Sequence, residues 1–116
     1  MKNATGQDRS ITSRWRPATQ AVRGGTWRSE HGETSEALFL NSGYTYDSAE
    51  TVAARFAGEQ KGMTYSRLQN PTVAMLEERI ALMDGAEACR VQASGMAAMT
   101  AALLSQLSAG DHIVGG

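Results

Sequence analysis

The sequence predicts an α/β fold in which a strand, a helix and a second strand form one right-handed βαβ unit. An apolar run over residues 88–93 has the length and composition of a buried strand. Small helix-forming residues follow at 95–107, and after a turn the apolar run at 112–114 begins a second strand. A helical pattern at 71–84 precedes this unit. Two strands are too few for a stable parallel sheet buried on both faces, so the pattern also predicts a truncated sequence.

The N-terminal part of the chain carries weaker signals. Residues 1–16 are polar and aperiodic, which predicts a flexible N-terminus. Residues 17–22 favour a short helix closed by Gly24-Gly25. The polar stretch 26–36 predicts a loop, and residues 37–40 form a brief extended apolar segment.

A capping-box arrangement marks the next helix. Asp47 is followed three residues later by Glu50, which predicts a helix from Asp47 to about Ala57. Val52 and Phe56 then share one face of that helix. A polar loop bounded by glycines leads from its end to Tyr65.

The helix over residues 71–84 has the clearest end signals. Asn70 caps its first turn, Pro71 supplies the φ that the first helical position needs, and Gly85 is a typical stop. Its large apolar side chains recur at helical spacing, which predicts one buried stripe. The stripe consists of Val73, Leu76, Ile80 and Met83.

Composition and charge are those of an ordinary globular chain. The 116 residues are 41% hydrophobic and 20% charged, with a net charge of −1. Residues 1–28 hold six basic groups and one acid (+5), whereas residues 29–116 hold five basic groups and eleven acids (−6). The basic end lacks interleaved aromatic residues, so we expect a solvated arm and no nucleic-acid contact. No apolar stretch is long enough for a signal peptide or a membrane span, which favours the cytoplasm.

Three residues that often carry chemistry have plainer explanations here. The single cysteine, Cys89, excludes a disulfide framework, and we expect it to be a small buried hydrophobe in a strand. His31 and His112 lie far apart without ligand-like spacing, so we expect structural or solvated histidines and no metal site.

Ser94-Gly95 marks a candidate anion site. Ser94 is a good N-cap, and Gly95 lets an anion approach the backbone without a Cβ in the way. The first N–H groups of a helix lack partners and carry partial positive charge, which suits a phosphate. An ordinary capped strand–helix junction has the same pattern.

A second anion signal stands about twenty-five residues earlier. Tyr65 offers a phenol hydroxyl, and Arg67 offers a guanidinium fork that suits phosphate or carboxylate. A solvated arginine and a half-buried tyrosine are the simpler explanations of each residue alone. Their closeness to a capped helix and to a second anion signal favours phosphate binding.

The two stretches carry a family resemblance. Tyr-Ser-Arg-x-x-Asn-Pro-Thr at residues 65–72, followed by Ala-Ser-Gly-Met-Ala-Ala at 93–98, resembles the cystathionine γ-synthase family of pyridoxal phosphate (PLP) enzymes. The likeness extends over about residues 19–116, and stretches 32–40 and 42–50 most resemble the O-succinylhomoserine sulfhydrylases within it. It implies the large domain of a fold type I PLP-dependent transferase, truncated after its first βαβ portion. Residues 17–70 would then form an N-terminal arm used for oligomerisation, and residues 71–116 the start of the PLP-binding domain.

The resemblance also implies a site and a reaction. The amides of Gly95 and Met96 would hold the cofactor phosphate, and Tyr65 and Arg67 would reach the phosphate in the neighbouring subunit. This implies a homodimer with shared active sites, commonly paired into a tetramer. The implied reaction replaces the succinate of O-succinylhomoserine by sulfide to give homocysteine for methionine synthesis. Cystathionine γ-synthase and γ-lyase activities remain alternatives.

The lysines depart from the family pattern. Lys2 lies in the polar tail and Lys61 in a glycine-rich loop, and neither matches the family's catalytic lysine. We therefore assign no catalytic residue, and we expect this chain alone not to catalyse. A non-catalytic module that binds an anion or oligomerises is the alternative from another functional class.

Overall fold

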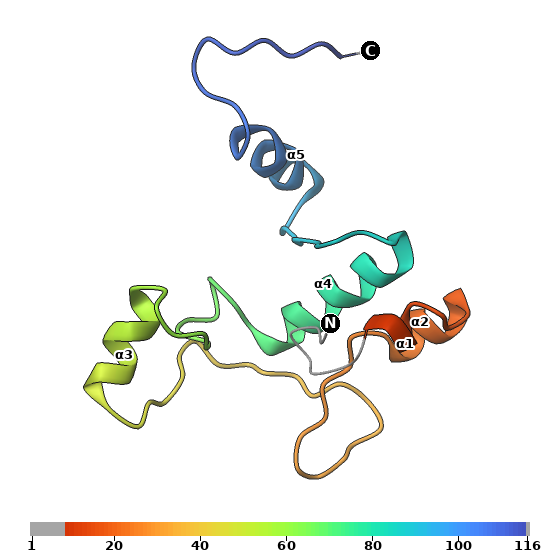
Figure 1. Cartoon of the computed structure of the whole chain (residues 1–116), viewed down its shortest axis with the longest axis vertical. Helices are drawn as coiled ribbons and strands as arrows, with labels where there is room; N and C mark the ends of the chain where they lie inside the picture. The colour runs from red at the N-terminus through yellow and green to blue at the C-terminus, as the bar shows by residue number, and fades with distance from the viewer. Residues whose placement is uncertain (1–8, 116) are drawn as a thin grey trace.

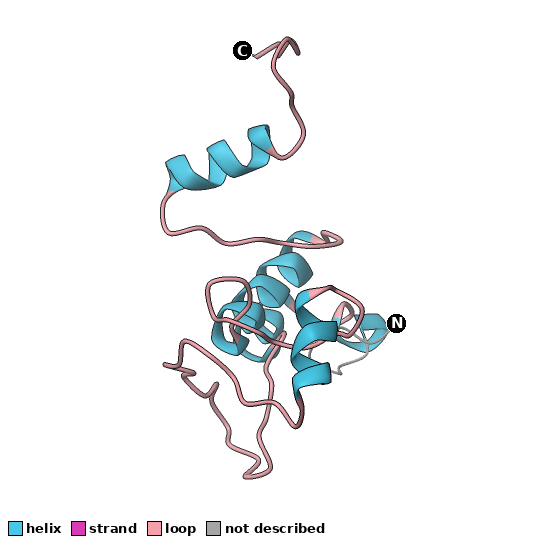
Figure 2. Ribbon diagram, turned by 90° about the vertical axis from the view of Figure 1, so that its left-hand side faces the viewer, coloured by secondary structure: helices cyan, strands magenta, loops and turns pink. Residues whose placement is uncertain are grey.

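The computed structural model describes residues 9–115, and five helices form within that range (Figure 1). They are α1 (Arg9–Thr12), α2 (Pro17–Arg23), α3 (Ala49–Phe56), α4 (Pro71–Asp84) and α5 (Gly95–Leu104). In Figures 1 and 2, α5 and the residues after it stand apart from the other helices. None of the helices in the described range has the length and apolarity that a membrane span requires.

The predicted βαβ unit is represented by its helix alone. Within residues 9–115 no ladder strand forms, and Gly43 and Tyr65 make an isolated antiparallel bridge. Residues 88–93 and 112–114 run as loops that lie apart in both views (Figures 1 and 2). The two predicted strands do not form in this structure. A parallel strand needs a neighbouring strand to pair with its backbone, and it needs other elements to cover both of its faces.

The structure confirms the bounds of α4. The side chain of Asn70 accepts a hydrogen bond from the Thr72 amide at 2.9 Å, and Pro71 occupies the first helical position. Gly85 ends the helix in the left-handed conformation, with φ of 65°. Glycine adopts this conformation without the steric cost that a Cβ imposes.

The buried face of α4 differs from the predicted one. Its buried residues are Pro71, Met75, Ala81 and Leu82, whereas Leu76 is 46% exposed. Of the other three residues in the predicted stripe, Val73 and Met83 are exposed and Ile80 is half-buried. The stripe prediction was wrong because α2 and the chain after it pack on a different side of α4.

Gly24-Gly25 brings the N-terminal part of the chain close to α4. A Cβ at Gly25 would lie 2.7 Å from the carbonyl oxygen of Met75, and Gly25 has a φ of +71°. The side chain of Arg79 donates to the carbonyl oxygen of Gly24 at 2.9 Å and also forms an ion pair with Glu36. The Trp27 amide lies 3.1 Å from the sulfur of Met75. Contacts with backbone and side chains thus hold residues 24–36 on α4.

Three smaller predictions are adjusted by the structure. The helix predicted at 17–22 is α2, which runs to Arg23. Ser48 rather than Asp47 caps α3, because its hydroxyl accepts from the Thr51 amide at 3.2 Å. Helix α5 ends at Leu104, three residues before the predicted end at residue 107.

Helix α1 was not predicted from the sequence. The side chain of Gln20 donates to the carbonyl oxygens of Thr12 and Ser13 at 3.3 and 3.2 Å, which joins α1 to α2. A flexible N-terminus was predicted for residues 1–16, and residues 1–8 of this stretch lie outside the described residues.

Candidate cofactor-binding site

The loop before α4 presents Arg67 at the tip of a turn. The amides of Leu68 and Gln69 both donate to the Tyr65 carbonyl oxygen, at 2.9 and 3.0 Å, and close the turn. The guanidinium carbon of Arg67 lies 5.1 Å from the centre of the Tyr65 ring, which is a cation–π geometry. Both side chains are exposed, so an anion in solvent can reach them.

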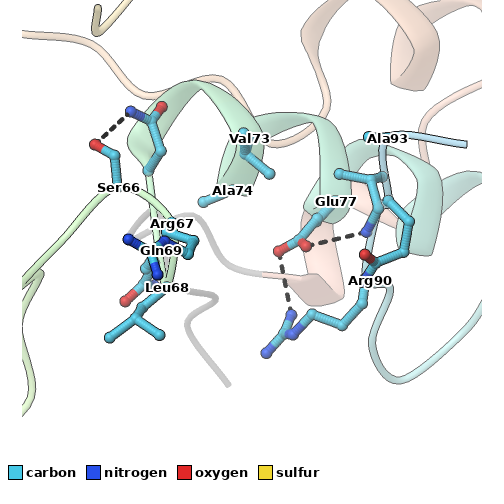
Figure 3. A pocket seen from close by; sticks show the side chains of 12 residues that line it. Ser66, Arg67, Leu68, Gln69, Val73, Ala74, Glu77, Arg90 and Ala93 are labelled. Carbon is cyan, nitrogen blue, oxygen red and sulfur yellow. Dashed lines mark hydrogen bonds and ion pairs between the residues drawn. The ribbon is translucent and has the colours of Figure 1, made fainter. Parts of the chain in front are cut away.

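A cavity of about 590 Å³ lies between this loop, α4 and residues 90–93 (Figure 3). Arg67 and Gln69 line it from the loop, Glu77 from α4, and Arg90 and Ala93 from the opposite side. Its lining includes two cationic groups and one carboxylate, so a small anion is the ligand that its charge favours.

Glu77 connects α4 to the segment that leads into α5. Its carboxylate accepts from the Val91 amide at 3.1 Å and from the Arg90 guanidinium at 3.2 Å (Figure 3). The Glu77 side chain is 17% exposed, whereas that of Arg90 is 77% exposed. Glu77 thereby supplies the Val91 amide with a partner that a neighbouring strand would otherwise give.

The N-terminus of α5 has the predicted cap. The Ser94 hydroxyl accepts from the Ala97 amide at 3.2 Å, and the Ser94 carbonyl oxygen accepts from the Ala98 amide at 3.0 Å. Apart from its chain neighbours and the backbone of its own helix, no atom of the described residues lies within 4 Å of the position that a Cβ on Gly95 would take. The start of α5 is therefore open to a group as large as a phosphate, and its first amides have the polarity that suits an anion.

The structure brings the four predicted cofactor residues together only in part. Arg67 lines the cavity that also reaches Ala93, the residue before Ser94. Tyr65, Gly95 and Met96 do not line it. The two anion sites predicted from the sequence thus do not line one common cavity.

The other candidates from the sequence are not part of this cavity. Lys61, His31 and His112 are exposed, and Lys2 lies outside the described residues. Cys89 is half-buried in a loop rather than buried in a strand. Among residues 9–115, no group of three or more His, Cys, Asp or Glu side chains is placed to hold a metal ion.

Sequence reasoning missed Glu77 as a residue of this region. The sequence could have indicated its position, because residue 77 lies at helical spacing from residues 70, 73 and 74 and therefore shares one helix face with them. That face lines the cavity. The predicted apolar stripe shares Val73 with this face, but it continues through Leu76 and leaves out Glu77.

Comparison with known proteins identifies the family. A family model described as Cys/Met metabolism PLP-dependent enzyme matches residues 18–116. The O-succinylhomoserine sulfhydrylase of Pseudomonas aeruginosa is 51% identical over 96 residues, which are 83% of this chain and 24% of that protein. The L-methionine gamma-lyase of Treponema denticola is 37% identical over 99 residues, covering 85% of this chain and 25% of that protein. The chain thus spans about a quarter of the length of these curated relatives.

A solved structure shows the same likeness in three dimensions. It is of a protein described as an O-acetylhomoserine (thiol)-lyase from Campylobacter jejuni, and it contains N'-pyridoxyl-lysine-5'-monophosphate. It superposes with a TM-score of 0.79 at 34% identity, over 84% of this chain and 24% of that one. Because the family model covers residues 18–116, this chain belongs to the family of PLP-dependent enzymes of cysteine and methionine metabolism.

Proposed function

We propose that this chain forms part of a γ-replacement enzyme that makes homocysteine from O-succinylhomoserine and sulfide. The observation that carries the proposal is the 51% identity to the Pseudomonas aeruginosa O-succinylhomoserine sulfhydrylase. The sulfhydrylase of Mycobacterium tuberculosis is also 50% identical over 97 residues. These values exceed the 37% identity to the methionine gamma-lyase of Treponema denticola.

In this proposal two parts of the chain bind the phosphate of PLP. The amides of Gly95 and Met96 donate to it at the open N-terminus of α5, where a Cβ-free residue permits close approach. Arg67 adds a bidentate cation, and Tyr65 adds a hydroxyl donor and holds the guanidinium plane. Bound PLP supplies the electron sink for loss of the γ-substituent, and these residues retain and orient the cofactor.

The assembly is also a proposal. Tyr65 and Arg67 are exposed, and the cavity that Arg67 lines does not include Gly95 or Met96, which supports a role for Tyr65 and Arg67 in the site of a neighbouring subunit. We therefore propose a homodimer with shared active sites that pairs into a tetramer in the cytoplasm. Residues 17–70 would serve as the arm between subunits, and residues 71–116 would begin the cofactor-binding domain.

Two alternatives remain for the activity. A γ-elimination activity is supported by the 37% identity to an L-methionine gamma-lyase, and a cystathionine γ-synthase activity is the other alternative within the family. A non-catalytic anion-binding or oligomerisation module is supported by the exposure of Lys61 and by the lack of an assigned catalytic lysine.

A chimera tests the proposed reaction. The matched residues of this chain would replace the corresponding quarter of the Pseudomonas aeruginosa sulfhydrylase, and the product would be assayed for PLP content and homocysteine formation. We expect PLP to be retained and O-succinylhomoserine to be converted with sulfide. Conversion of methionine without use of O-succinylhomoserine would instead favour γ-elimination. A chimera with Arg67→Ala should lose most of its PLP, and unchanged PLP content would show that Arg67 has no role in cofactor binding.

A further inference from the structure

The side chain of Asn70 makes three hydrogen bonds, although one is enough to cap α4. Its oxygen accepts from the Thr72 amide at 2.9 Å, which is the capping bond. Its amide nitrogen donates to the carbonyl oxygen of Phe39 at 2.9 Å and to the hydroxyl of Ser66 at 3.1 Å (Figure 3 shows the bond at Ser66). Asn70 is 8% exposed, so these bonds form away from bulk water.

Ser66 and Thr72 extend the same network to residues 37–42. The Ser66 hydroxyl donates to the carbonyl oxygen of Asn41 at 2.5 Å, and the Ser66 amide donates to that of Ser42 at 2.9 Å. The Thr72 hydroxyl accepts from the Phe39 amide at 2.9 Å and donates to the Ala37 carbonyl oxygen at 3.2 Å. We call the side chains of Ser66, Asn70 and Thr72, with the backbone that they bind at 37–42, the clasp.

The clasp, together with the adjoining residues Gly43 and Tyr44, holds the turn that carries Arg67 at both ends. On one side Ser66 is held to residues 41 and 42, and its neighbour Tyr65 pairs with Gly43. On the other side the Tyr44 hydroxyl donates to the Gln69 carbonyl oxygen at 3.2 Å, and Asn70 follows directly. Among the described residues, Arg67 itself makes no hydrogen bond or ion pair with residues 37–42 that would substitute for these bonds.

We infer that Asn70 is a positioning residue, whose side-chain amide holds residues 37–42 against the 65–70 loop and so places Tyr65 and Arg67 for phosphate. The inference rests on the proposed function, because the proposed function assigns phosphate binding to the loop that carries Arg67. The part of Asn70 that matters is its NH₂ group, since serine or aspartate can also provide a cap. Any residue with a capping oxygen and no side-chain NH₂ group should keep α4 and lose the placement of the loop.

Two variants of the whole chain separate these roles. Asn70→Ser is neutral and keeps a capping hydroxyl, and Asn70→Asp keeps the size and the capping oxygen, but both lack the NH₂ donor. Ser48→Ala is the matched control, because it removes a helix-cap hydrogen bond at α3, outside the clasp. Each protein is titrated with inorganic phosphate while the backbone amide NMR signals of residues 65–69 are followed, and amide hydrogen exchange is measured in parallel.

We expect both Asn70 variants to raise the apparent dissociation constant for phosphate about fivefold, which corresponds to the net value of one hydrogen bond. We also expect exchange at the Phe39 and Ser66 amides to accelerate at least tenfold, while exchange in the middle of α4 and the helical circular dichroism stay unchanged. Ser48→Ala should change none of these values at residues 39 and 65–69. Unchanged affinity and unchanged exchange in both Asn70 variants would overturn the inference.

The same titration distinguishes a failure of the proposed function from a failure of the clasp. Arg67→Ala should abolish the phosphate-induced shifts at residues 65–69. If those shifts persist in Arg67→Ala, the phosphate role of Arg67 is wrong, and the exchange data alone then decide whether Asn70 holds residues 37–42. If they vanish while both Asn70 variants behave as the unchanged chain, the phosphate site stands and the positioning role of Asn70 is wrong.

Discussion

The guanidinium group of Arg67 lies over the ring of Tyr65, 5.1 Å from its centre. The two residues are separated by one position in the chain and sit in a closed turn, so this contact is local. It limits the orientations available to an exposed arginine before any anion binds. The cost in side-chain entropy of binding an anion is therefore smaller.

The stacked pair can be tested by replacing the ring. Tyr65→Phe keeps an aromatic face and Tyr65→Leu does not, while both remove the hydroxyl. We expect the phosphate affinity of Tyr65→Leu to be about two- to fivefold below that of Tyr65→Phe, which is the range for an exposed cation–π contact. The ring-current shift of the Arg67 side-chain protons should persist in Tyr65→Phe and vanish in Tyr65→Leu. Equal affinities would show that the stacking does not assist binding.

Gly25 should be intolerant of any side chain. Gly25→Ala would combine a strained positive φ with a Cβ at 2.7 Å from the Met75 carbonyl oxygen, so α2 would have to move from α4. Gly32 has a similar φ of +62° with nothing within 4 Å of its Cβ position, and Gly32→Ala is the control. We expect Gly32→Ala to cost about 1–2 kcal/mol of unfolding free energy from the backbone alone, and Gly25→Ala clearly more. Equal midpoints in urea would contradict the close approach.

The observed buried face of α4 predicts unequal costs for two leucines. Leu82 is 8% exposed and Leu76 is 46% exposed. Leu82→Ala should destabilise the chain by about 2–4 kcal/mol, because it removes buried contacts and leaves a cavity, whereas Leu76→Ala should cost less than about 1 kcal/mol. Thermal unfolding followed by circular dichroism measures both. A larger loss of stability for Leu76→Ala than for Leu82→Ala would instead support the buried stripe that the sequence predicted.

The loop at residues 29–33 should open in acid. Hydrogen bonds from the Ser29 hydroxyl at 2.7 Å and the Ser29 amide at 2.9 Å lower the pKa of Glu33 to about 2. Because the folded pKa lies below the ordinary 4.5, the contribution of Glu33 to loop stability is complete above pH 4.5 and is lost as pH falls through about 2. NMR titration of the Ser29 amide should show this low midpoint, and Ser29→Ala should raise it. A midpoint near 4.5 in the unchanged chain would contradict the loop geometry.

Local signals predicted the ends of α4, and distant contacts decided which of its faces is buried. Asn70, Pro71 and Gly85 act within one or two turns of themselves, so their effect can be read from the sequence. The choice between the Leu76 face and the Leu82 face depends on where α2 packs. That position depends in turn on the close approach at Gly25, which hydrophobic spacing does not encode.

The strands depend even more on distant partners. Residues 88–93 have strand composition, but no segment in the described range pairs with them, and Glu77 binds the Val91 amide instead. In the site, the motif at residues 65–72 indicated Tyr65 and Arg67, because their side chains suit a phosphate. The donors of Asn70 were missed, since their partners at residues 39 and 66 become neighbours only in the folded chain.

The most direct test of the account is an NMR titration of the chain with pyridoxine 5'-phosphate, which resembles PLP but lacks the aldehyde that reacts with lysines. We expect saturable shifts of the Gly95 and Met96 amides and of residues 65–67, and no such shifts with pyridoxine, which lacks the phosphate. Equal responses to the two compounds, or shifts confined to other residues, would contradict the claim that these residues bind the cofactor phosphate.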